Sequence, residues 1–200
     1  ISSATFPSAS FSRALGREQP APDDSAVDVF NTASWPRGEL VTVPKYLAEQ
    51  RNLVLDATGE SLPTQRLRSG ELAFLAKDVP ALSFRRYTLR EGNPSPESKT
   101  TQLKASGAWL ENDRVRLRLD EKTGGIVELR AQGLEGNLAD TSSGHALNDY
   151  LYLIGDNLGD LQRNGPVTIR VGERGPLVAS LIVESDAPGC FKLWREIRLT

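Results

Sequence analysis

The feature that most constrains the fold of this chain is a two-residue alternation in the segment ENDRVRLRLDEKTGGIVELR. Val115, Leu117 and Leu119 alternate with arginines, which places the aliphatic side chains on one face of a strand and the charged side chains on the other. The residues EKTGG then provide a turn in which Gly124 and Gly125 are free to adopt positive φ, and IVELR returns as the partner strand. The sequence therefore predicts a β-hairpin with one apolar face.

Short apolar segments bounded by Gly, Pro, Asn or Asp recur along the rest of the chain. The first are VDVF, GELVTV, NLVLD, GELAFLA and ALSFRRYTL, and the later ones are DYLYLIG, VTIRVG, PLVASLIVES and FKLWREIRL. This spacing is typical of strands joined by turns, and only KYLAEQ, residues 45–50, favours a helical turn. We therefore predict an all-β chain with less than about a tenth of its residues in helices, against roughly 30–35% in an average globular protein.

Composition divides the chain into four parts. Residues 1–25 are rich in Ser, Ala and Pro and hold few large apolar side chains, so we expect a linker or arm there. Residues 26–90 are expected to form a small β-sandwich. The polar, proline-containing stretch 91–104, EGNPSPESKTTQLK, predicts a second linker. Residues 105–200 are expected to form part of a large β-sandwich domain.

Charge and hydropathy exclude several classes of protein. Lys and Arg number 24 and Asp and Glu number 26, which does not indicate a nucleic-acid-binding surface. No apolar run of about eighteen residues is present, so we expect no contact with a membrane. The N-terminal segment lacks the basic-then-apolar order of a signal peptide, and we expect an intracellular location.

The two ends predict a segment of a longer polypeptide. The chain begins at Ile1 and contains no methionine. Its last residues, FKLWREIRLT, have the pattern of a strand with no turn or polar tail after it. We therefore expect the second sandwich to continue beyond Thr200.

Few side chains are candidates for catalysis. Retaining glycosidases use two carboxylates about 5–5.5 Å apart, and Glu135 or Asp140 can be nominated, although most such carboxylates simply solvate strands and turns. His145 lies near Ser143 and Asp149 in the sequence. No GxSxG segment is present, and three residues this close together are typical of an ordinary loop. We therefore assign no catalytic residue.

Metal binding has equally little support in the sequence. One histidine and one cysteine, Cys190, do not make a conventional zinc site or an internal disulfide. The segment GDNLGDLQRNG, residues 155–165, holds several oxygen ligands but lacks the spacing of an EF-hand, and a polar loop is expected instead. The arginines at 114, 116 and 118 are most simply a solvated strand face. We expect no cofactor in this chain.

Five phrases of the sequence, taken together, resemble the region that follows the catalytic barrel and helical domain in glycoside hydrolase family 38 α-mannosidases. They are VFNTASWPRGELVTVP (29–44), LVLDATGESLPTQ (53–65), GELAFLAKDVPALSFRRYTL (70–89), WLENDRVRLRLDEKTGGIVELR (109–130) and GERGPLVASLIVES (172–185). Their order and spacing match that family over most of residues 27–200.

The resemblance implies a small β-sandwich followed by the start of a larger, galactose-mutarotase-like β-supersandwich. It implies a retaining enzyme that cleaves α-mannosidic bonds with a zinc ion held in its catalytic domain. The upstream barrel and helical domain of the same polypeptide, and a carbohydrate substrate, are then the partners of this segment. Tyr150, in DYLYL, matches a tyrosine that lines the substrate pocket in that family, and is the one site residue predicted here.

Two other functions stay open. A β-sandwich is also typical of a free-standing carbohydrate-binding module, although Trp35, Trp109 and Trp194 are spread along the sequence without an evident platform. A purely structural interaction module is the third reading. Tyr150 likewise has a simple interpretation as a packing residue with its hydroxyl at a wet edge.

Overall fold

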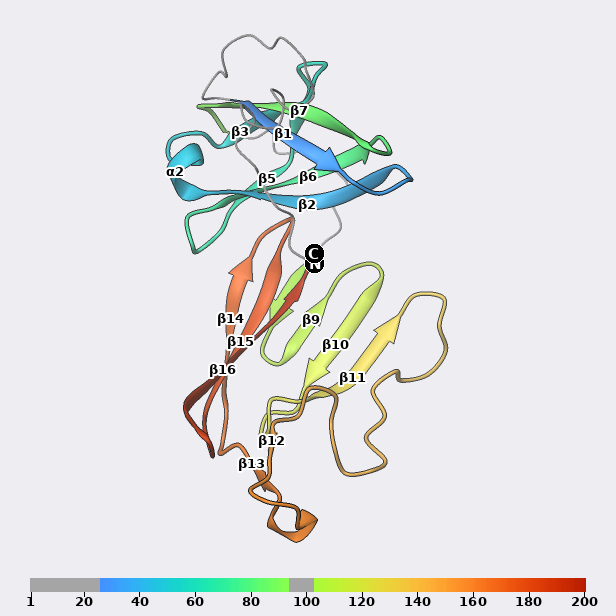
Figure 1. The fold of residues 1–200 in the computed structure, drawn as a ribbon, viewed down its shortest axis with the longest axis vertical. Coiled ribbons are helices and arrows are strands. Elements are labelled where there is room, and N and C mark those ends of the chain that lie inside the picture. The colour runs from blue at the N-terminus through green and yellow to red at the C-terminus, as the bar shows by residue number, and fades with distance from the viewer. Residues whose placement is uncertain (1–25, 94–102) are drawn as a thin grey trace. The chain divides into compact units, whose positions relative to one another are not determined.

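The computed structural model describes residues 26–93 and 103–200 (Figure 1). The chain divides into two compact units, residues 1–100 and 101–200. Of the described residues 51% lie in strands and 4% in helices, which confirms the all-β prediction. No described helix is long and apolar enough to cross a membrane. The predicted arm, 1–25, and most of the predicted linker lie outside the described residues, and the predicted domain boundaries stay predictions.

The first unit consists of two antiparallel sheets. Their strand orders are β1-β7-β3-β4 and β2-β6-β5. The strands are β1 (Ala26–Asn31), β2 (Arg37–Val43), β3 (Leu53–Leu55), β4 (Ser61–Leu62), β5 (Thr64–Arg66), β6 (Leu72–Val79) and β7 (Ser83–Arg90). The helical turn predicted from KYLAEQ is present as α2 (Lys45–Ala48).

Side chains from both sheets form the core of this unit. Phe74 of β6 is fully buried and lies against Tyr87 of β7, with ring centroids 4.9 Å apart. Aliphatic side chains complete the same cluster: Val43, Val54, Leu72 and Leu89. Burial raises the pKa of the Tyr87 hydroxyl. The unit is therefore a β-sandwich with an apolar interior.

A cross-strand ion pair joins β1 to β7 in the first unit. Asp28 lies directly opposite Arg86 in the register of the two strands. The Asp28 side chain is 1% exposed. Its two oxygens accept hydrogen bonds from Nε (2.7 Å) and NH2 (2.8 Å) of Arg86. This two-pronged geometry is the strong form of an arginine–carboxylate contact, and it raises the pKa of Arg86.

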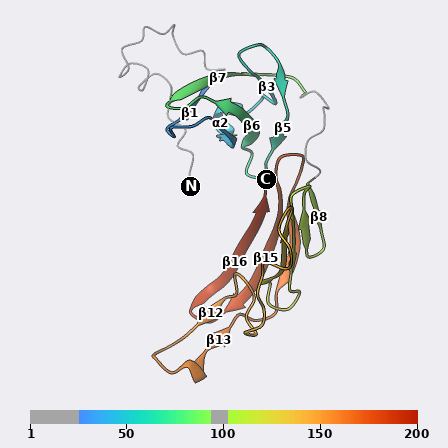
Figure 2. The ribbon, with the colours of Figure 1, turned by 90° about the vertical axis from the view of Figure 1, so that its right-hand side faces the viewer.

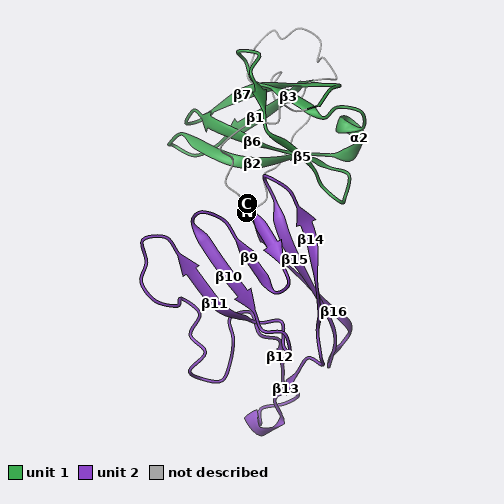
Figure 3. Ribbon diagram, turned by 180° about the vertical axis from the view of Figure 1, so that it is seen from behind, with its two compact units in different colours: residues 1–100 green, residues 101–200 purple. Residues whose placement is uncertain are grey.

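The second unit is also a sandwich of antiparallel sheets, of order β11-β10-β9-β8 and β14-β15-β16. Figure 2 labels β8 of the first sheet and β15 and β16 of the second. Its strands are β8 (Lys104–Ser106), β9 (Trp109–Glu111), β10 (Val115–Leu119), β11 (Ile126–Ala131), β12 (Leu151–Tyr152), β13 (Gln162–Arg163), β14 (Thr168–Arg174), β15 (Ala179–Ala187) and β16 (Cys190–Leu199). Leu110 and Leu119 of the first sheet share one core cluster with Leu181 and Val183 of the second. Figure 3 shows the two sheets of this unit from behind.

The hairpin predicted from the alternation is confirmed as β10 and β11. Leu117 and Leu119 are buried, and Arg116 and Arg118, which alternate with them, lie on the other face. Gly124 adopts a φ of +70°, whereas Gly125 does not share a positive φ. Gly125 is required for another reason: a side chain at this position would overlap Asp149 and Ala146 of the neighbouring loop.

The strand predicted from DYLYLIG is much shorter than expected. Only Leu151–Tyr152 is a strand, paired with the equally short β13, and Tyr150 lies just before it. The chain leaves the ladder at the glycine-containing turn that follows and forms a 3-10 turn, η1 (Leu158–Asp160). Because β13 offers only two partner residues, the ladder cannot extend to the full apolar run.

The edge of β11 is covered by the loop that follows it. Asn137 accepts hydrogen bonds from the N–H of Leu129 (2.8 Å) and of Ala139 (3.1 Å), and donates one to the carbonyl of Val127 (2.9 Å). Its side-chain amide therefore occupies the position of a neighbouring strand. The N–H of Leu138 continues this ladder by donating to the carbonyl of Leu129 (2.8 Å).

We expect Asp28→Ala to lower the free energy of unfolding of the first unit by about 1.5–3 kcal/mol, because it removes two charge-assisted hydrogen bonds at a buried position. Arg37→Ala is the matched control, since Arg37 and Glu39 form an exposed pair worth at most about 1 kcal/mol. Urea unfolding measures the free energy of unfolding of each variant. Equal losses in the two variants would contradict a special contribution of the buried Asp28–Arg86 pair.

Candidate functional site

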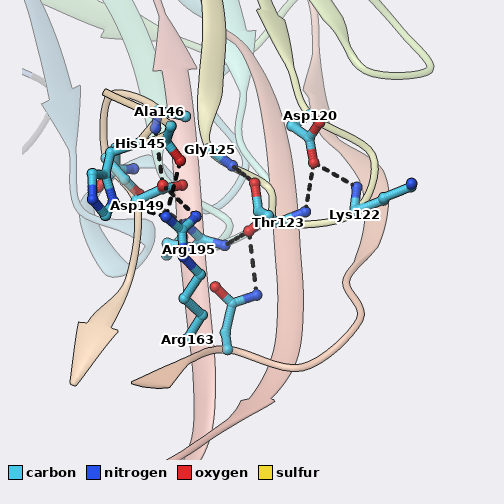
Figure 4. Close-up of polar contacts among 12 residues, drawn as sticks. Asp120, Lys122, Thr123, Gly125, His145, Ala146, Asp149, Arg163 and Arg195 are labelled. Carbon is cyan, nitrogen blue, oxygen red and sulfur yellow. Dashed lines mark hydrogen bonds and ion pairs between the residues drawn. The ribbon is translucent and has the colours of Figure 1, made fainter. Parts of the chain in front are cut away.

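The loop between β11 and β12 carries most of the residues that the sequence nominates, and Asp149 fixes its end. The Asp149 side chain is 6% exposed. Its Oδ2 atom accepts hydrogen bonds from the N–H of Ala146 (2.9 Å) and from NH1 of Arg163 (3.2 Å), as Figure 4 shows. A carboxylate this buried needs such partners, because an unpaired buried charge is costly.

Arg163 of β13 ties three parts of this loop together. Besides Asp149, it donates through NH2 to the carbonyl of Gly144 (2.9 Å) and contacts Nδ1 of His145 at 2.8 Å. Arginine has only donors, so Nδ1 accepts where this contact is a hydrogen bond. His145 is thereby part of the polar network of the loop.

Arg195 of β16 reaches the same cluster from the opposite sheet. Its NH1 donates to the carbonyl of Asn148 (2.9 Å) and its NH2 to the carbonyl of Thr123 (2.6 Å). Burial lowers the pKa of Arg195, and the negative charge of Asp149 acts in the opposite direction. Sequence analysis missed this residue. The sequence does indicate its orientation: Arg195 is two residues from the buried Ile197 in the same strand, so both side chains lie on the same face.

The turn before β11 is shaped to admit these two charged groups. A Cβ on Gly125 would collide with Oδ1 of Asp149 and would lie 2.7 Å from Cβ of Ala146. A Cβ on Gly124 would lie 2.7 Å from NH2 of Arg195. The paired glycines therefore let a carboxylate and a guanidinium approach the backbone of the turn.

Asp120 closes this turn from its other end. Its Oδ1 accepts hydrogen bonds from the N–H of Lys122 (2.9 Å) and of Thr123 (2.8 Å). Burial acts to raise the pKa of Asp120, but these hydrogen bonds outweigh it and hold the pKa below its usual value. Asp120 thus holds the same turn whose Thr123 carbonyl accepts from Arg195.

Two buried polar atoms of the cluster have no hydrogen-bond partner among the described residues: Oδ1 of Asp149 and Nε of Arg195. One is an acceptor and the other a donor. The hydrogen bonds that the two side chains do make join them to loop and turn backbone and, for Asp149, also to the side chain of Arg163 in β13. The arrangement holds the loop that ends at Tyr150 in one conformation.

Tyr150 follows Asp149 directly, and its position is fixed from both sides. Its hydroxyl donates a hydrogen bond to the carbonyl of Pro188 (2.6 Å), in the turn between β15 and β16. Partial burial raises the pKa of Tyr150, and the neighbouring Cys190 acts in the same direction. The phenol is therefore neutral at physiological pH. With its proton committed to Pro188, its oxygen retains lone pairs that can accept a hydrogen bond.

Tyr152 contacts the same turn. A Cβ on Gly189 would collide with the Tyr152 ring, so the glycine allows the ring to pack against the backbone of the β15–β16 turn. Gly189 also has a φ of +78°, which favours glycine. The exposed Cys190 and the fully exposed Phe191 follow this turn. Several aromatic side chains therefore lie at this end of the second unit.

The carboxylates that the sequence nominates have ordinary structural surroundings. Glu135 and Asp140 are both exposed in the loop. The N–H of Ser142 donates to Asp140 (2.8 Å) and lowers its pKa. No hydrogen bond within the described part of the chain joins Ser143, His145 and Asp149 to one another. These residues do not form a nucleophile–base pair.

The structure offers no set of ligands for a metal ion within residues 26–93 and 103–200: no group of three or more His, Cys, Asp or Glu side chains is close enough. In the segment 155–165, Asn157 caps η1 by accepting from the N–H of Gly159 (3.0 Å). Its side-chain amide also donates to Asp160 (3.1 Å). These oxygens are therefore committed to the loop itself.

Comparison with solved structures identifies the class of fold. The chain has the fold of part of the glycosyl hydrolase family 38 proteins. One neighbour is a protein of that family from Enterococcus faecalis, with a TM-score of 0.50 and 15% identity over 82% of this chain and 24% of the other. A second is an alpha-mannosidase from Enterococcus faecalis V583, with a TM-score of 0.51 and 12% identity over 89% of this chain and 28% of the other.

The chain thus spans about a quarter of the length of the two solved structures. No family model matches its sequence, and no curated protein matches it either. The likeness lies in the fold, since at 12–15% identity few side chains are shared.

We expect Gly125→Ala to destabilise the second unit by about 1–3 kcal/mol, because the added Cβ overlaps a buried carboxylate that cannot move without losing Arg163 and the N–H of Ala146. Gly165→Ala is the control, since a Cβ there makes only an ordinary contact, 3.5 Å from the carbonyl of Asp186. Thermal unfolding compares the two. A neutral Gly125→Ala would show that the loop adapts and that Asp149 does not fix it.

Proposed function

We propose that this chain is a non-catalytic accessory segment of an enzyme that hydrolyses α-mannosidic bonds, and that it shapes the carbohydrate site of that enzyme. The observation that carries the proposal is the likeness of 82–89% of the chain to about a quarter of two glycosyl hydrolase family 38 proteins, one of them described as an alpha-mannosidase. A segment that corresponds to a quarter of an enzyme is expected to support a site rather than to contain it.

The proposed catalytic partner is a barrel and helical domain of the same polypeptide, which would hold a zinc ion and the nucleophile of a retaining mechanism. The described residues of this chain do not fit such a metal, because no group of three or more potential ligands occurs among them. No step of the reaction is therefore assigned to this chain. Its contribution is the positioning of side chains at the edge of the carbohydrate site.

Tyr150 is the residue proposed to contact the sugar. Its hydroxyl donates to Pro188, so toward a substrate it acts as a hydrogen-bond acceptor for a sugar hydroxyl. The Asp149 cluster on one side and the β15–β16 turn on the other fix its backbone and its ring. A side chain held in this way loses little conformational entropy when it binds, which favours its use in a binding site.

The chain by itself is expected not to hydrolyse aryl α-mannosides, with or without added zinc, because its described residues hold neither a metal-ligand set nor a hydrogen-bonded nucleophile–base pair. The assay follows release of the aryl group by the purified chain. Activity that survives purification and disappears on mutation of a residue of this chain would overturn the accessory role.

In the intact enzyme we expect Tyr150→Phe to lower kcat/KM roughly two- to tenfold, since the hydrogen bond to the sugar is lost together with the one to Pro188 while the ring is kept. Tyr152→Phe is the matched control, because the Tyr152 ring packs against Gly189 and no hydrogen bond of its hydroxyl is formed with a described residue. Kinetics and melting temperature are measured for both. If Tyr150→Phe lowers the melting temperature but leaves kcat/KM unchanged, Tyr150 has a structural role through Pro188 and does not contact the sugar.

A further inference from the structure

The outer face of the β8–β11 sheet carries a group of arginines in an unusual arrangement. Arg116 of β10 lies directly opposite Arg130 of β11, and Arg118 lies one step further along the same face. Their side chains are 52%, 56% and 42% exposed, respectively. Like charges directly opposite each other on neighbouring strands destabilise a sheet. This arrangement therefore has a cost that the fold does not require.

The carboxylates on this face do not balance its positive charge. Glu111 pairs with Lys104 (3.6 Å) and with Arg116 (3.6 Å). Glu128 pairs with Arg118 (3.8 Å) and with Arg130 (3.0 Å). Each of two glutamates is thus shared by two cations, which leaves a local excess of two positive charges. The whole chain has a net charge of −2, so this excess is a local concentration.

The ring of Trp109 holds two of the guanidinium groups in place. The guanidinium carbon of Arg116 lies 4.1 Å from the centroid of the Trp109 ring, and that of Arg118 lies 5.5 Å from it. Cation–π contacts of this kind restrict the orientation of an arginine without using its hydrogen-bond donors. The two side chains are therefore partly ordered before any ligand binds.

The donors that recognise anions remain available on all three arginines. Each ion pair of Arg116, Arg118 and Arg130 with a glutamate is made through Nε. Their terminal NH1 and NH2 groups donate no hydrogen bond to any residue in the described part of the chain. These terminal groups form the fork that binds phosphate, sulfate or carboxylate in a two-pronged manner.

We propose that this face, defined by Arg116, Arg118 and Arg130, binds a tetrahedral oxyanion of the phosphate or sulfate type. The bound anion offsets the repulsion between Arg116 and Arg130 and occupies the free donors of all three side chains. The site is separate from the proposed role of Tyr150 and does not depend on it. Its ligand is either a free ion or the same group carried on a sugar, since the chemistry recognised is the same.

The test uses the complete chain, with inorganic phosphate and a hexose phosphate as probes. Isothermal titration at constant ionic strength measures the affinity, and thermal unfolding measures the accompanying rise in melting temperature. The double variant Arg116→Gln, Arg130→Gln is expected to bind both probes at least tenfold more weakly than the unmodified chain. Without ligand its melting temperature should stay close to that of the unmodified chain, because relief of the Arg116–Arg130 repulsion offsets the loss of their exposed contacts with Glu111, Glu128 and Trp109.

Two further variants separate specific binding from general electrostatics. Arg170→Gln, on the other sheet, removes an arginine with 42% side-chain exposure and is expected to leave phosphate binding unchanged. Arg118→Lys keeps the charge but loses the fork and is expected to weaken binding severalfold. Tighter binding of the hexose phosphate assigns a sugar-borne ligand, and equal binding assigns the free ion.

Unchanged phosphate affinity in the double variant would overturn the proposal. So would an equal loss of affinity in Arg170→Gln, since the effect would then follow net charge and not this face. Stabilisation by chloride equal to that by phosphate at the same ionic strength would overturn it as well.

Discussion

The loops of the second unit depend on a charged side chain that enters from the inner face of a strand. Arg195 extends from β16 to the carbonyl of Thr123 in the β10–β11 turn and to the carbonyl of Asn148 in the long loop. Two carbonyls far apart in sequence thereby share one guanidinium. The cost of burying this guanidinium is offset by the two carbonyls and by the negative charge of Asp149. Arg195 and Asp149 can both approach the turn because Gly124 and Gly125 have no side chains.

Contacts between residues far apart in the sequence also limit how much of this structure can be predicted from the sequence. The β10–β11 hairpin could be predicted because its signal is local: an alternation of period two and a glycine turn lie within one short segment. The length of β12 could not, since it is set by the two residues that β13 offers as partners. An apolar segment indicates which residues favour a β-strand, but the number of residues in the strand depends on the partner strand with which it pairs.

The candidate site shows the same division. Tyr150 was selected through a resemblance, and its sequence neighbourhood contains no indication that its hydroxyl is bonded to Pro188, 38 residues away. Asp149 and His145 were visible as a polar loop, but the arginine that joins them, Arg163, comes from a later strand. Networks of this kind are assembled by tertiary contacts, so no window of sequence contains them. Arg116 and Arg118 were interpreted as part of a solvated strand face, which agrees with their exposure but does not reveal that Arg116 lies opposite Arg130.

The side chain of Asn137 has a consequence for how this protein can associate with others. Strand-by-strand growth of a sheet needs free N–H and carbonyl groups along an exposed edge. On β11 the N–H of Leu129 and the carbonyl of Val127 are bound by Asn137, and Ile126 exchanges two hydrogen bonds with Leu147. An incoming chain would have to displace this loop before it could pair. The Asn137 amide, together with the backbone of Leu138 and Leu147, therefore disfavours edge-to-edge association of the sheet through β11.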